Sequence, residues 1–594
     1  MQLRFSSITA LLAILWLIVP VKAETPFSQV QLSNDLVINL THIPDSPRPD
    51  DSKIPPPPSS SPEPPVSQLL PPPEELLEPP LESPATPEVP SPIIQDTITV
   101  ESFEFTGNTA FSDQQLAVVT KSFTSRPITF AELLSARTAV TKLYTDNGYL
   151  TSGAFIPPQS LDRGSVTIAI VEGGLDEIEV SSKGRLNPGY VRSRLEIATG
   201  KPLNVQRLLD ALRLLQLDPL IENLSAELST GSGPGTSLLS VTVTEANSWR
   251  YQIIANNGRS PSVGSFRRGV SLTQANLLGL GDGISVSYTN TDGSDGIDLS
   301  YSLPLNPRNG KVTLSYGDTS SEVIEDPFNN LDIESDSRYF DLTIRQPLLQ
   351  TPTEEFALGL TASRRESETV FLEDLGFPSS GADEDGRTRV SALRFFQEWT
   401  KRNAQEVVAL RSQFSLGLDV FDATVNDDNP QTGEDVPDSR FFAWRGQAQW
   451  VRLLATDSLL LIRGDIQLAD QVMLPIEQFA LGGLGSVRGY RQDQLLTDNG
   501  AFASAEVRLP ILRVSKWDAL LQLTPFVDLG TTWNNGDRED PDPNSLASVG
   551  VGLLWQQGER FRARLDWGIP LISVDSTGDS LQEDGVYFSI EFNP

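Results

Sequence analysis

The chain has 594 residues, too many for one compact domain, so we expect several domains. Its 45 Lys and Arg residues stand against 78 Asp and Glu residues, and the net charge of -33 argues against nucleic acid or an anionic bilayer surface as a partner, because both would repel it. Cysteine is absent and His42 is the only histidine, which excludes disulfides and Cys-ligated metal sites and removes most general-base chemistry.

Residues 1–23 are typical of a secretory signal peptide. Arg4 precedes an apolar stretch from Ile8 to Val19, and Val21-Lys-Ala23 provides small residues at a cleavage site. The alternative is an N-terminal membrane anchor, but the apolar stretch is short for a spanning helix. We therefore expect an exported protein.

Residues 24–97 are predicted to hold a short helix followed by a linker. Apolar residues recur at helical spacing over 33–43, which predicts an amphipathic helix; a mature N-terminus without regular structure is the alternative. Residues 44–92 contain 19 of the 44 prolines, mixed with Ser and Glu. Such a segment cannot bury a core, so we expect a stiff spacer, partly in polyproline II conformation.

Residues 98–246 show the order strand, helix, helix, strand, strand twice, which predicts two consecutive α+β domains over 98–173 and 174–246. Each domain is expected to bury one face of a sheet under two helices. Side chains that can cap a helix N-terminus precede the four predicted helices, at Ser112, Thr129, Asn187 and Asn204.

From about residue 247 onward, nearly every stretch alternates apolar with polar residues, as in Ile284-Ser-Val286-Ser-Tyr288. A period of two is typical of strands with one apolar and one wet face. About 16 such stretches occur, at 250–257, 267–277, 282–290, 296–303, 311–317, 338–346, 356–364, 388–401, 405–419, 439–453, 458–470, 499–510, 518–529, 546–556, 559–567 and 585–593.

The connectors between these stretches alternate in length. Short ones such as 402–404 and 557–558 are followed by long acidic ones such as 365–387 and 471–498. This alternation is typical of an outer-membrane barrel with short periplasmic turns and long outer loops. The alternative is several soluble β-domains, but such domains have no reason to alternate short and long connectors. We therefore predict a membrane β-barrel of about 16 antiparallel strands over 247–594. Four aromatic residues near predicted strand ends are candidates for interfacial girdles, namely Tyr490, Trp533, Trp567 and Tyr587.

The most informative segment is 481–491, Leu-Gly-Gly-Leu-Gly-Ser-Val-Arg-Gly-Tyr-Arg, which precedes Phe526-Val-Asp528-Leu-Gly530. Arg488 lies in a long Gly-rich loop, and Asp528 is expected at the end of a strand. If the loop folds back into the barrel, the planar guanidinium can grip the carboxylate with two hydrogen bonds. The pair would then act as a latch for the loop; a purely structural role in holding the loop is the alternative.

These motifs resemble those of the two-partner secretion transporters, the TpsB-type haemolysin secretion and activation family within the outer-membrane assembly superfamily. The similarity covers nearly everything from residue 98 to residue 594. Its motifs are Val487-Arg-Gly-Tyr490, Phe526-x-Asp528-x-Gly530, Tyr144-x-x-Asn147-Gly-Tyr149, Ser152-Gly-Ala-Phe-Ile-Pro157-Pro, Val171-Glu-Gly173 and Leu214-Leu-Gln-x-Asp218-Pro.

The resemblance implies a barrel in the outer membrane, embedded in its lipid, with two polypeptide-transport-associated (POTRA) domains in the periplasm. These domains would receive a large, unfolded, β-rich partner exoprotein and pass it outward through the pore. The resemblance also implies that Arg488 pairs with Asp528 inside the lumen, that Gly485 and Gly489 allow a tight backbone, and that Tyr490 packs the loop tip. In the family a leading helix on a linker occupies the pore at rest, which residues 33–43 match in position only.

We expect the POTRA domains to bind the exoprotein by adding one of its strands to a sheet edge, because main-chain hydrogen bonds read an extended conformation more than a sequence. The candidate edge residues are Ala154, Phe155 and Ile156 in the first domain and Leu224 and Ser225 in the second. Ordinary structural edges are the alternative.

Two other functions compete with export. A barrel of about 16 strands is wide enough for an aqueous channel, so a solute porin is one, although a porin does not need two periplasmic domains. An insertase for other barrel proteins is the second, since close relatives of that kind share the arginine loop.

The sequence has no phosphate-binding loop and no nucleophile elbow, so we expect no enzyme, no catalytic residue, no metal and no cofactor. For the latch, we expect Asp528→Arg to abolish secretion and added Arg488→Asp to restore part of it.

Overall fold

The computed structural model describes residues 97–594 except 161–163, 234, 373–374, 427–434 and 575–577. The predicted signal peptide, the predicted helix over 33–43 and the Pro-rich spacer lie outside these residues. Among the described helices, none has both the length and the apolar character needed to cross a membrane.

The first α+β domain packs two helices against a three-stranded sheet of order β2-β5-β4. Its elements are β1 (Ile98–Val100), β2 (Ser102–Thr106), α3 (Asp113–Thr120), the 3₁₀ turn η3 (Lys121–Phe123), β3 (Arg126–Ile128), α4 (Phe130–Asp146), β4 (Gly153–Phe155) and β5 (Ser165–Val171). The strand expected over 99–106 is broken at Glu101, whose N–H donates to the carbonyl of Gly164 at 2.6 Å. The short strand β3 pairs with β1 and was not predicted, because three residues that include Pro127 carry no strand pattern.

The second α+β domain has the sheet order β6-β8-β7, with β6 parallel and β7 antiparallel to the central strand. Its elements are β6 (Gly174–Lys183), α5 (Pro188–Ala198), α6 (Val205–Gln216), β7 (Ile221–Thr230) and β8 (Thr236–Glu245). Its core joins both helices to the sheet through residues such as Val191, Leu212 and Val241. All four predicted helix caps are confirmed, because the side chains of Ser112, Thr129, Asn187 and Asn204 each accept a hydrogen bond from a backbone N–H in the first turn.

Motif carboxylates hold each of these domains together. Glu172 accepts hydrogen bonds from the Tyr144 hydroxyl and from the N–H of Ala110, both at 2.8 Å. Burial opposes the charge of Glu172, but the hydrogen bonds that it accepts outweigh burial and lower its pKa. Burial, together with the bond to Glu172, raises the pKa of Tyr144. In the second domain, the carboxylate of Asp218 accepts from the Tyr190 hydroxyl at 2.7 Å. The motif residues Tyr144 and Glu172 are therefore buried in the first domain, whereas Asp218 is half-buried.

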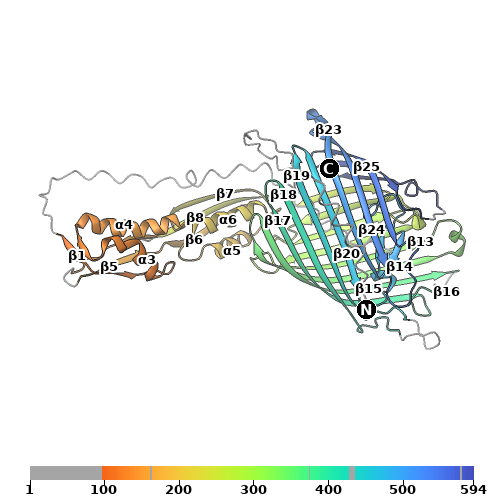
Figure 1. The fold of residues 1–594 in the computed structure, drawn as a ribbon, viewed down its shortest axis with the longest axis horizontal. Helices are drawn as coiled ribbons and strands as arrows, with labels where there is room; N and C mark the ends of the chain where they lie inside the picture. The colour runs from red at the N-terminus through yellow and green to blue at the C-terminus, as the bar shows by residue number, and fades with distance from the viewer. Residues whose placement is uncertain (1–96, 161–163, 234, 373–374, 427–434, 575–577) are drawn as a thin grey trace. The chain divides into compact units, whose positions relative to one another are not determined.

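Sixteen long strands form one closed antiparallel barrel, which confirms the predicted fold class (Figure 1). They are β9 (Trp249–Asn256), β10 (Arg267–Ala275), β11 (Gly283–Asn290), β12 (Ser294–Pro304), β13 (Lys311–Glu322), β14 (Glu334–Gln350), β15 (Glu354–Phe371), β17 (Arg387–Arg402), β18 (Glu406–Leu418), β19 (Phe442–Ala455), β20 (Ser458–Ala469), β23 (Asn499–Val514), β24 (Ala519–Trp533), β25 (Ser545–Gln557), β26 (Phe561–Pro570) and β27 (Val586–Phe592). Each overlaps one of the predicted stretches. The two-residue strand β16 (Leu375–Gly376) adds a short pairing at the end of β15.

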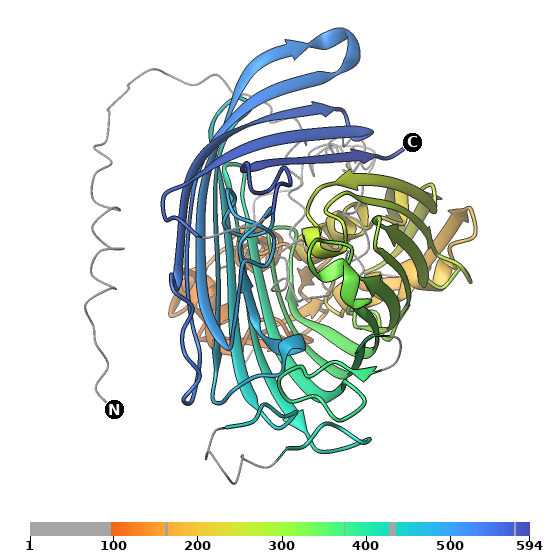
Figure 2. The ribbon, with the colours of Figure 1, turned by 90° about the vertical axis from the view of Figure 1, so that its right-hand side faces the viewer.

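Neighbouring strands follow one another round the barrel wall, and the last strand returns to the first (Figure 2). The closing pair, β27 with β9, is registered over four residue pairs, from Ser589 opposite Asn256 to Phe592 opposite Ile253. Several strands are longer than expected: β14 and β15 have 17 and 18 residues. The added ends lack a clear alternation of apolar and polar residues, but backbone pairing continues there because it does not depend on side-chain polarity.

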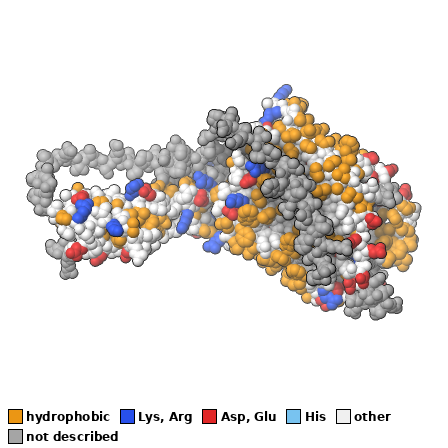
Figure 3. All heavy atoms as spheres, in the orientation of Figure 1, with side chains coloured by type: hydrophobic (Ala, Val, Ile, Leu, Met, Phe, Trp, Pro, Cys, Tyr) orange, Lys and Arg blue, Asp and Glu red, His pale blue; other side chains and the backbone are white. Residues whose placement is uncertain are grey.

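The two faces of the wall differ as the alternation predicts. Large apolar side chains such as Leu299, Leu342 and Leu565 are exposed on the outer face, and hydrophobic side chains gather on the barrel in Figure 3. Trp567 is also exposed and Trp533 is half-buried, so both stay predictions for an interfacial girdle. The girdle prediction was wrong for two other residues: Tyr490 and Tyr587 are buried, because a connecting loop packs against the inside of the wall.

Candidate functional site

The connection between β20 and β23, residues 470–498, is a folded loop. It contains the 3₁₀ turn η6 (Pro475–Glu477) and a small hairpin of β21 (Phe479–Leu481) with β22 (Leu495–Thr497). Its apolar side chains, including Val487, form a buried cluster with Phe502 of β23 and Leu546 of β25. Phe502 shares its face of β23 with the buried polar residues Ser504 and Glu506, so the loop packs against the inner face of the wall.

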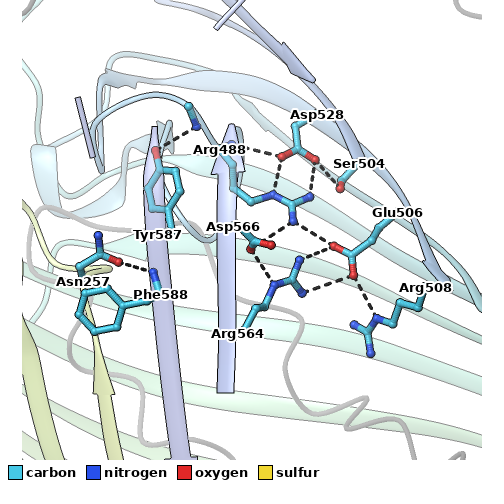
Figure 4. Close-up of polar contacts among 11 residues, drawn as sticks. Asn257, Arg488, Ser504, Glu506, Arg508, Asp528, Arg564, Asp566, Tyr587 and Phe588 are labelled. Atoms are coloured by element: carbon cyan, nitrogen blue, oxygen red, sulfur yellow. Dashed lines mark hydrogen bonds and ion pairs between the residues drawn. The ribbon is translucent and has the colours of Figure 1, made fainter. Parts of the chain in front are cut away.

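Arg488 is the largest of the almost fully buried side chains of this loop. Only 1% of Arg488 is exposed, and Asp528 is fully buried. The Nε of Arg488 donates to Asp528 Oδ2 at 2.7 Å and its Nη2 donates to Oδ1 at 3.0 Å, which is the two-bond fork expected from the sequence (Figure 4). Asp528 lies within β24 rather than at the end of a strand as expected, since pairing with β25 continues past it to Thr531.

Arg488 also belongs to a larger cluster of charges on three strands. Its Nη1 donates to Glu506 of β23 at 2.9 Å and lies 3.5 Å from a carboxylate oxygen of Asp566 of β26. Arg564 bridges these two carboxylates, and Arg508 donates to Glu506 at 3.0 Å. We call the six residues Arg488, Glu506, Arg508, Asp528, Arg564 and Asp566 the Arg488 cluster (Figure 4). It contains three guanidinium groups and three carboxylates, whereas the sequence predicted only one pair.

The strand motif shapes the surface that receives the loop. The guanidinium carbon of Arg488 lies 3.4 Å from the centre of the Phe526 ring, close enough for a cation–π contact. A Cβ atom added at Gly530 would lie 2.5 Å from the side chain of Leu481, so glycine makes room there for the loop. Ser504 donates to Asp528 at 2.6 Å from the neighbouring strand and fixes the carboxylate from the other side.

The loop tip contacts residues of β25, β26 and β27. Gly489 has a φ of +100°, and a Cβ added to it would lie 3.1 Å from the carbonyl carbon of Gly568 in β26. The N–H of Gly489 donates to the Tyr587 hydroxyl at 3.0 Å, and that hydroxyl donates to the carbonyl of Tyr490. The Tyr490 hydroxyl donates to the carbonyl of Ala547 at 2.7 Å. The expected tip packing of Tyr490 is therefore present in the structure.

Gly485 differs from the expectation. A Cβ added there meets nothing within 4 Å, so the backbone at this position does not need glycine. The tight turns fall instead at Gly482 and Gly483, with φ values of +114° and +95°. The spacing of glycines in the sequence does not show which of them bends the chain.

The candidate edge strands differ from each other. β4 is an edge strand of only three residues, and Ile156 lies beyond it. The N–H of Ala154 already donates to the Thr141 hydroxyl at 3.1 Å, while the side chain of Phe155 is exposed. β7 is an edge strand of ten residues, in which Leu224 is buried in the core and Ser225 is exposed. Of the two, β7 offers the longer edge.

Sequence reasoning missed Glu506, Asp566 and Arg564. Alternation does place all three on the wet face of their strands, which was the available signal. Their meeting depends on the register of four neighbouring strands and on the position of the loop, and neither follows from a local pattern. Within the described ranges, no group of His, Cys, Asp or Glu residues is arranged to hold a metal ion.

A closed antiparallel barrel that follows POTRA-type α/β domains and holds an arginine loop in its lumen defines the class of outer-membrane protein transporters. The family model described as haemolysin secretion/activation protein ShlB/FhaC/HecB matches residues 235–554, and the model of the ShlB-type POTRA domain matches 98–173. The chain belongs to the haemolysin secretion/activation family. It is a two-partner secretion transporter of the outer membrane with its POTRA domains in the periplasm.

Individual relatives are distant. The heme/hemopexin transporter protein HuxB of Haemophilus influenzae is 21% identical over 502 residues, which cover 79% of this chain and 82% of HuxB. The outer membrane transporter CdiB of Escherichia coli is 23% identical over 492 residues, 80% of this chain and 79% of CdiB. The solved structure of CdiB from Escherichia coli has a TM-score of 0.65 at 21% identity and covers 86% of this chain and 92% of that one. CdiB from Acinetobacter baumannii has a TM-score of 0.60 at 18% identity, covering 87% and 93%. These likenesses show the fold.

Proposed function

We propose that the chain exports one dedicated exoprotein, which crosses the barrel unfolded and β-rich, and that no bond of the client is made or broken on the way. The observation that carries this proposal is the burial of the Arg488 cluster, which ties loop 470–498 to the inner wall. A loop held there restricts the lumen in a way that a solute porin does not need. Folding of the client outside the cell supplies the driving force.

In this proposal, Arg488 and Asp528 form a latch that keeps the loop in place. Both groups are shielded from water, so removing one partner leaves the other charge buried and costs about 3–5 kcal/mol. A solvated pair would contribute about 1 kcal/mol or less. Because the pair is buried, we expect its loss to destabilise the position of the loop strongly.

The cluster changes the expected result of a charge exchange. In the double variant Arg488→Asp with Asp528→Arg, Glu506 and Asp566 lose the guanidinium that now lies 2.9 and 3.5 Å from them, and the shorter side chain at position 488 brings another negative charge to their side of the lumen. Like charges repel in a buried site, and the two carboxylates no longer have this arginine as a partner. We therefore expect the exchange to restore little secretion, in contrast to the prediction from the pair alone.

Deleting the gene for this chain tests the exporter against its alternatives. We expect one exoprotein to disappear from the medium while the level of other outer-membrane barrels stays unchanged, because a dedicated exporter serves one client. Quantitative proteomics of the medium and of the outer membrane measures both. A broad loss of outer-membrane barrels would support an insertase instead, and an unchanged medium would refute export. The family match favours export over insertion.

A further inference from the structure

Glu477 holds loop 470–498 to the barrel wall at a second place, independent of the Arg488 cluster. Arg394 of β17 donates to Glu477 with both Nη atoms, at 3.0 and 2.6 Å, and Arg365 of β15 donates through Nη1 at 3.3 Å. All three residues are buried, none more than 9% exposed. We call these residues the Glu477 cluster. Its carboxylate is gripped by a two-bond fork, the geometry that fixes position most precisely.

Apolar packing supports the same contact. Met473 and Leu474, just before η6, pack against Val390 of β17 and Phe441 beside β19 in a buried cluster. The side chain of Gln467 in β20 donates to the carbonyl of Glu477 at 3.0 Å. The first arm of the loop, residues 470–478, therefore has its own core and its own ion pairs.

The two clusters lie on different parts of the wall. The loop begins after β20 and ends before β23, which are neighbours in the barrel. From there the first arm reaches back past β19 and β18 to β17 and β15, whereas the tip reaches forward across β24 and β25 to β26. The loop thus covers the inner wall from β15 to β27, where Tyr587 bonds to the loop tip, and Leu484 lies against Gly258 just after the end of β9. Neither cluster includes a residue of β10 to β14.

We propose that Glu477 is a positioning residue for export: it fixes the first arm to β15 and β17 during transport, so that the client passes along the wall formed by β10 to β14. This inference rests on the proposed function only for the client's path. The attachment of the arm is a property of the chain alone and is measured without a client.

The experiment follows the two parts of the loop separately. Because the chain has no cysteine, each single variant Met473→Cys or Val487→Cys contains one thiol. Position 473 is 1% exposed and position 487 is fully buried, so labelling by a water-soluble maleimide reports local opening of the loop. In full-length protein, Glu477→Gln is expected to accelerate labelling at position 473 about tenfold or more and to leave position 487 nearly unchanged. Secretion is expected to fall about threefold or more, because the freed arm enters the client's path.

Glu398→Gln is the matched control. Glu398 also lies on β17 and also sits between two guanidinium groups, those of Arg345 and Arg411, but it does not contact the loop. We expect this variant to leave both labelling rates and secretion unchanged. Heat-modifiable migration in gels shows that each variant contains a folded barrel.

A double variant tests whether Glu477 acts through Arg394. If the two form one interaction, Glu477→Gln with Arg394→Gln labels no faster than either single variant. The double variant removes the Arg394 guanidinium together with the carboxylate, so of the Glu477 cluster only Arg365 keeps its charge. Additive acceleration would overturn the proposal, as would unchanged labelling at position 473 or acceleration in Glu398→Gln. Normal secretion with a freed arm would overturn the assigned path. If no exoprotein depends on the chain, the proposed function fails, while the labelling result stands.

Discussion

At the scale of single residues, the loop is held by charges that are buried together. Arg488 alone contacts carboxylates of three strands, through Asp528, Glu506 and Asp566. A buried charge is tolerated only when it is paired and hydrogen-bonded, so each member of the cluster depends on the others. This dependence explains why an arginine stands at the centre: its five donors are spread over a planar fork that can grip one carboxylate with two bonds and still reach another, whereas the three donors of lysine share one nitrogen.

We expect Asp528→Asn to release the loop tip. The amide cannot neutralise the guanidinium, so we expect the free energy needed to open the loop tip to fall by about 3 kcal/mol. A cysteine introduced at position 487 should then be labelled roughly a hundredfold faster. Secretion is expected to fall in parallel. Maleimide labelling and an assay of the medium check the two effects; an unchanged labelling rate would show that Asp528 does not hold the tip.

The two motif glycines are expected to differ sharply. Gly489→Ala forces a Cβ against β26 at a residue with φ of +100°, so the tip must shift and secretion should drop severalfold. Gly485→Ala adds a methyl group into open space and should leave secretion unchanged. Assaying both variants at equal expression compares them. Similar loss in both would mean that the tip is packed differently.

At the scale of elements, the strands decide what each domain can offer a client. Pairing with an extended polypeptide needs a row of free backbone groups, which the ten residues of β7 can supply and the three residues of β4 hardly can. In β4 the amide of Ala154 is already bonded to Thr141. The second domain is therefore our preferred site for strand addition.

A photo-crosslinker at Ser225 is expected to capture the client, and one at Ala154 to capture much less. Ser225 is exposed on the edge strand β7, whereas Ser240 lies on the central strand β8, between β6 and β7. The same crosslinker at Ser240 is the control and should capture nothing. Mass spectrometry of the adducts measures capture. Equal capture at Ser225 and Ser240 would exclude recognition by the β7 edge.

At the scale of the whole molecule, the barrel and the loop are held by different forces. The wall closes through backbone pairing of all 16 strands, including β27 with β9, and does not need the loop to satisfy its hydrogen bonds. The loop in turn depends on the wall, because its apolar and charged side chains are buried only against it. The lumen can therefore be changed without changing the barrel.

Replacing residues 475–492 with a short Gly-Ser linker is expected to leave a folded barrel with a larger conductance and no secretion. The barrel persists because its closing hydrogen bonds are intact, and conductance rises because the loop no longer crosses the lumen. Heat-modifiable migration, planar-bilayer recording and an assay of the medium measure the three properties. An unfolded product would show that the loop is part of the barrel's own stability.

The sequence by itself determined the elements and their class. Alternation of period two depends only on which face of each strand meets lipid, so it predicted about 16 strands. Capping side chains act within one turn, so they predicted the helix starts. The motif residues Arg488 and Asp528 also stood out as a pair. Only the tertiary structure decided what surrounds them. The register of β23 to β26 brings Glu506, Arg564 and Asp566 to Arg488, and the path of the loop brings Glu477 to Arg365 and Arg394, because contacts between distant segments depend on how the whole barrel closes.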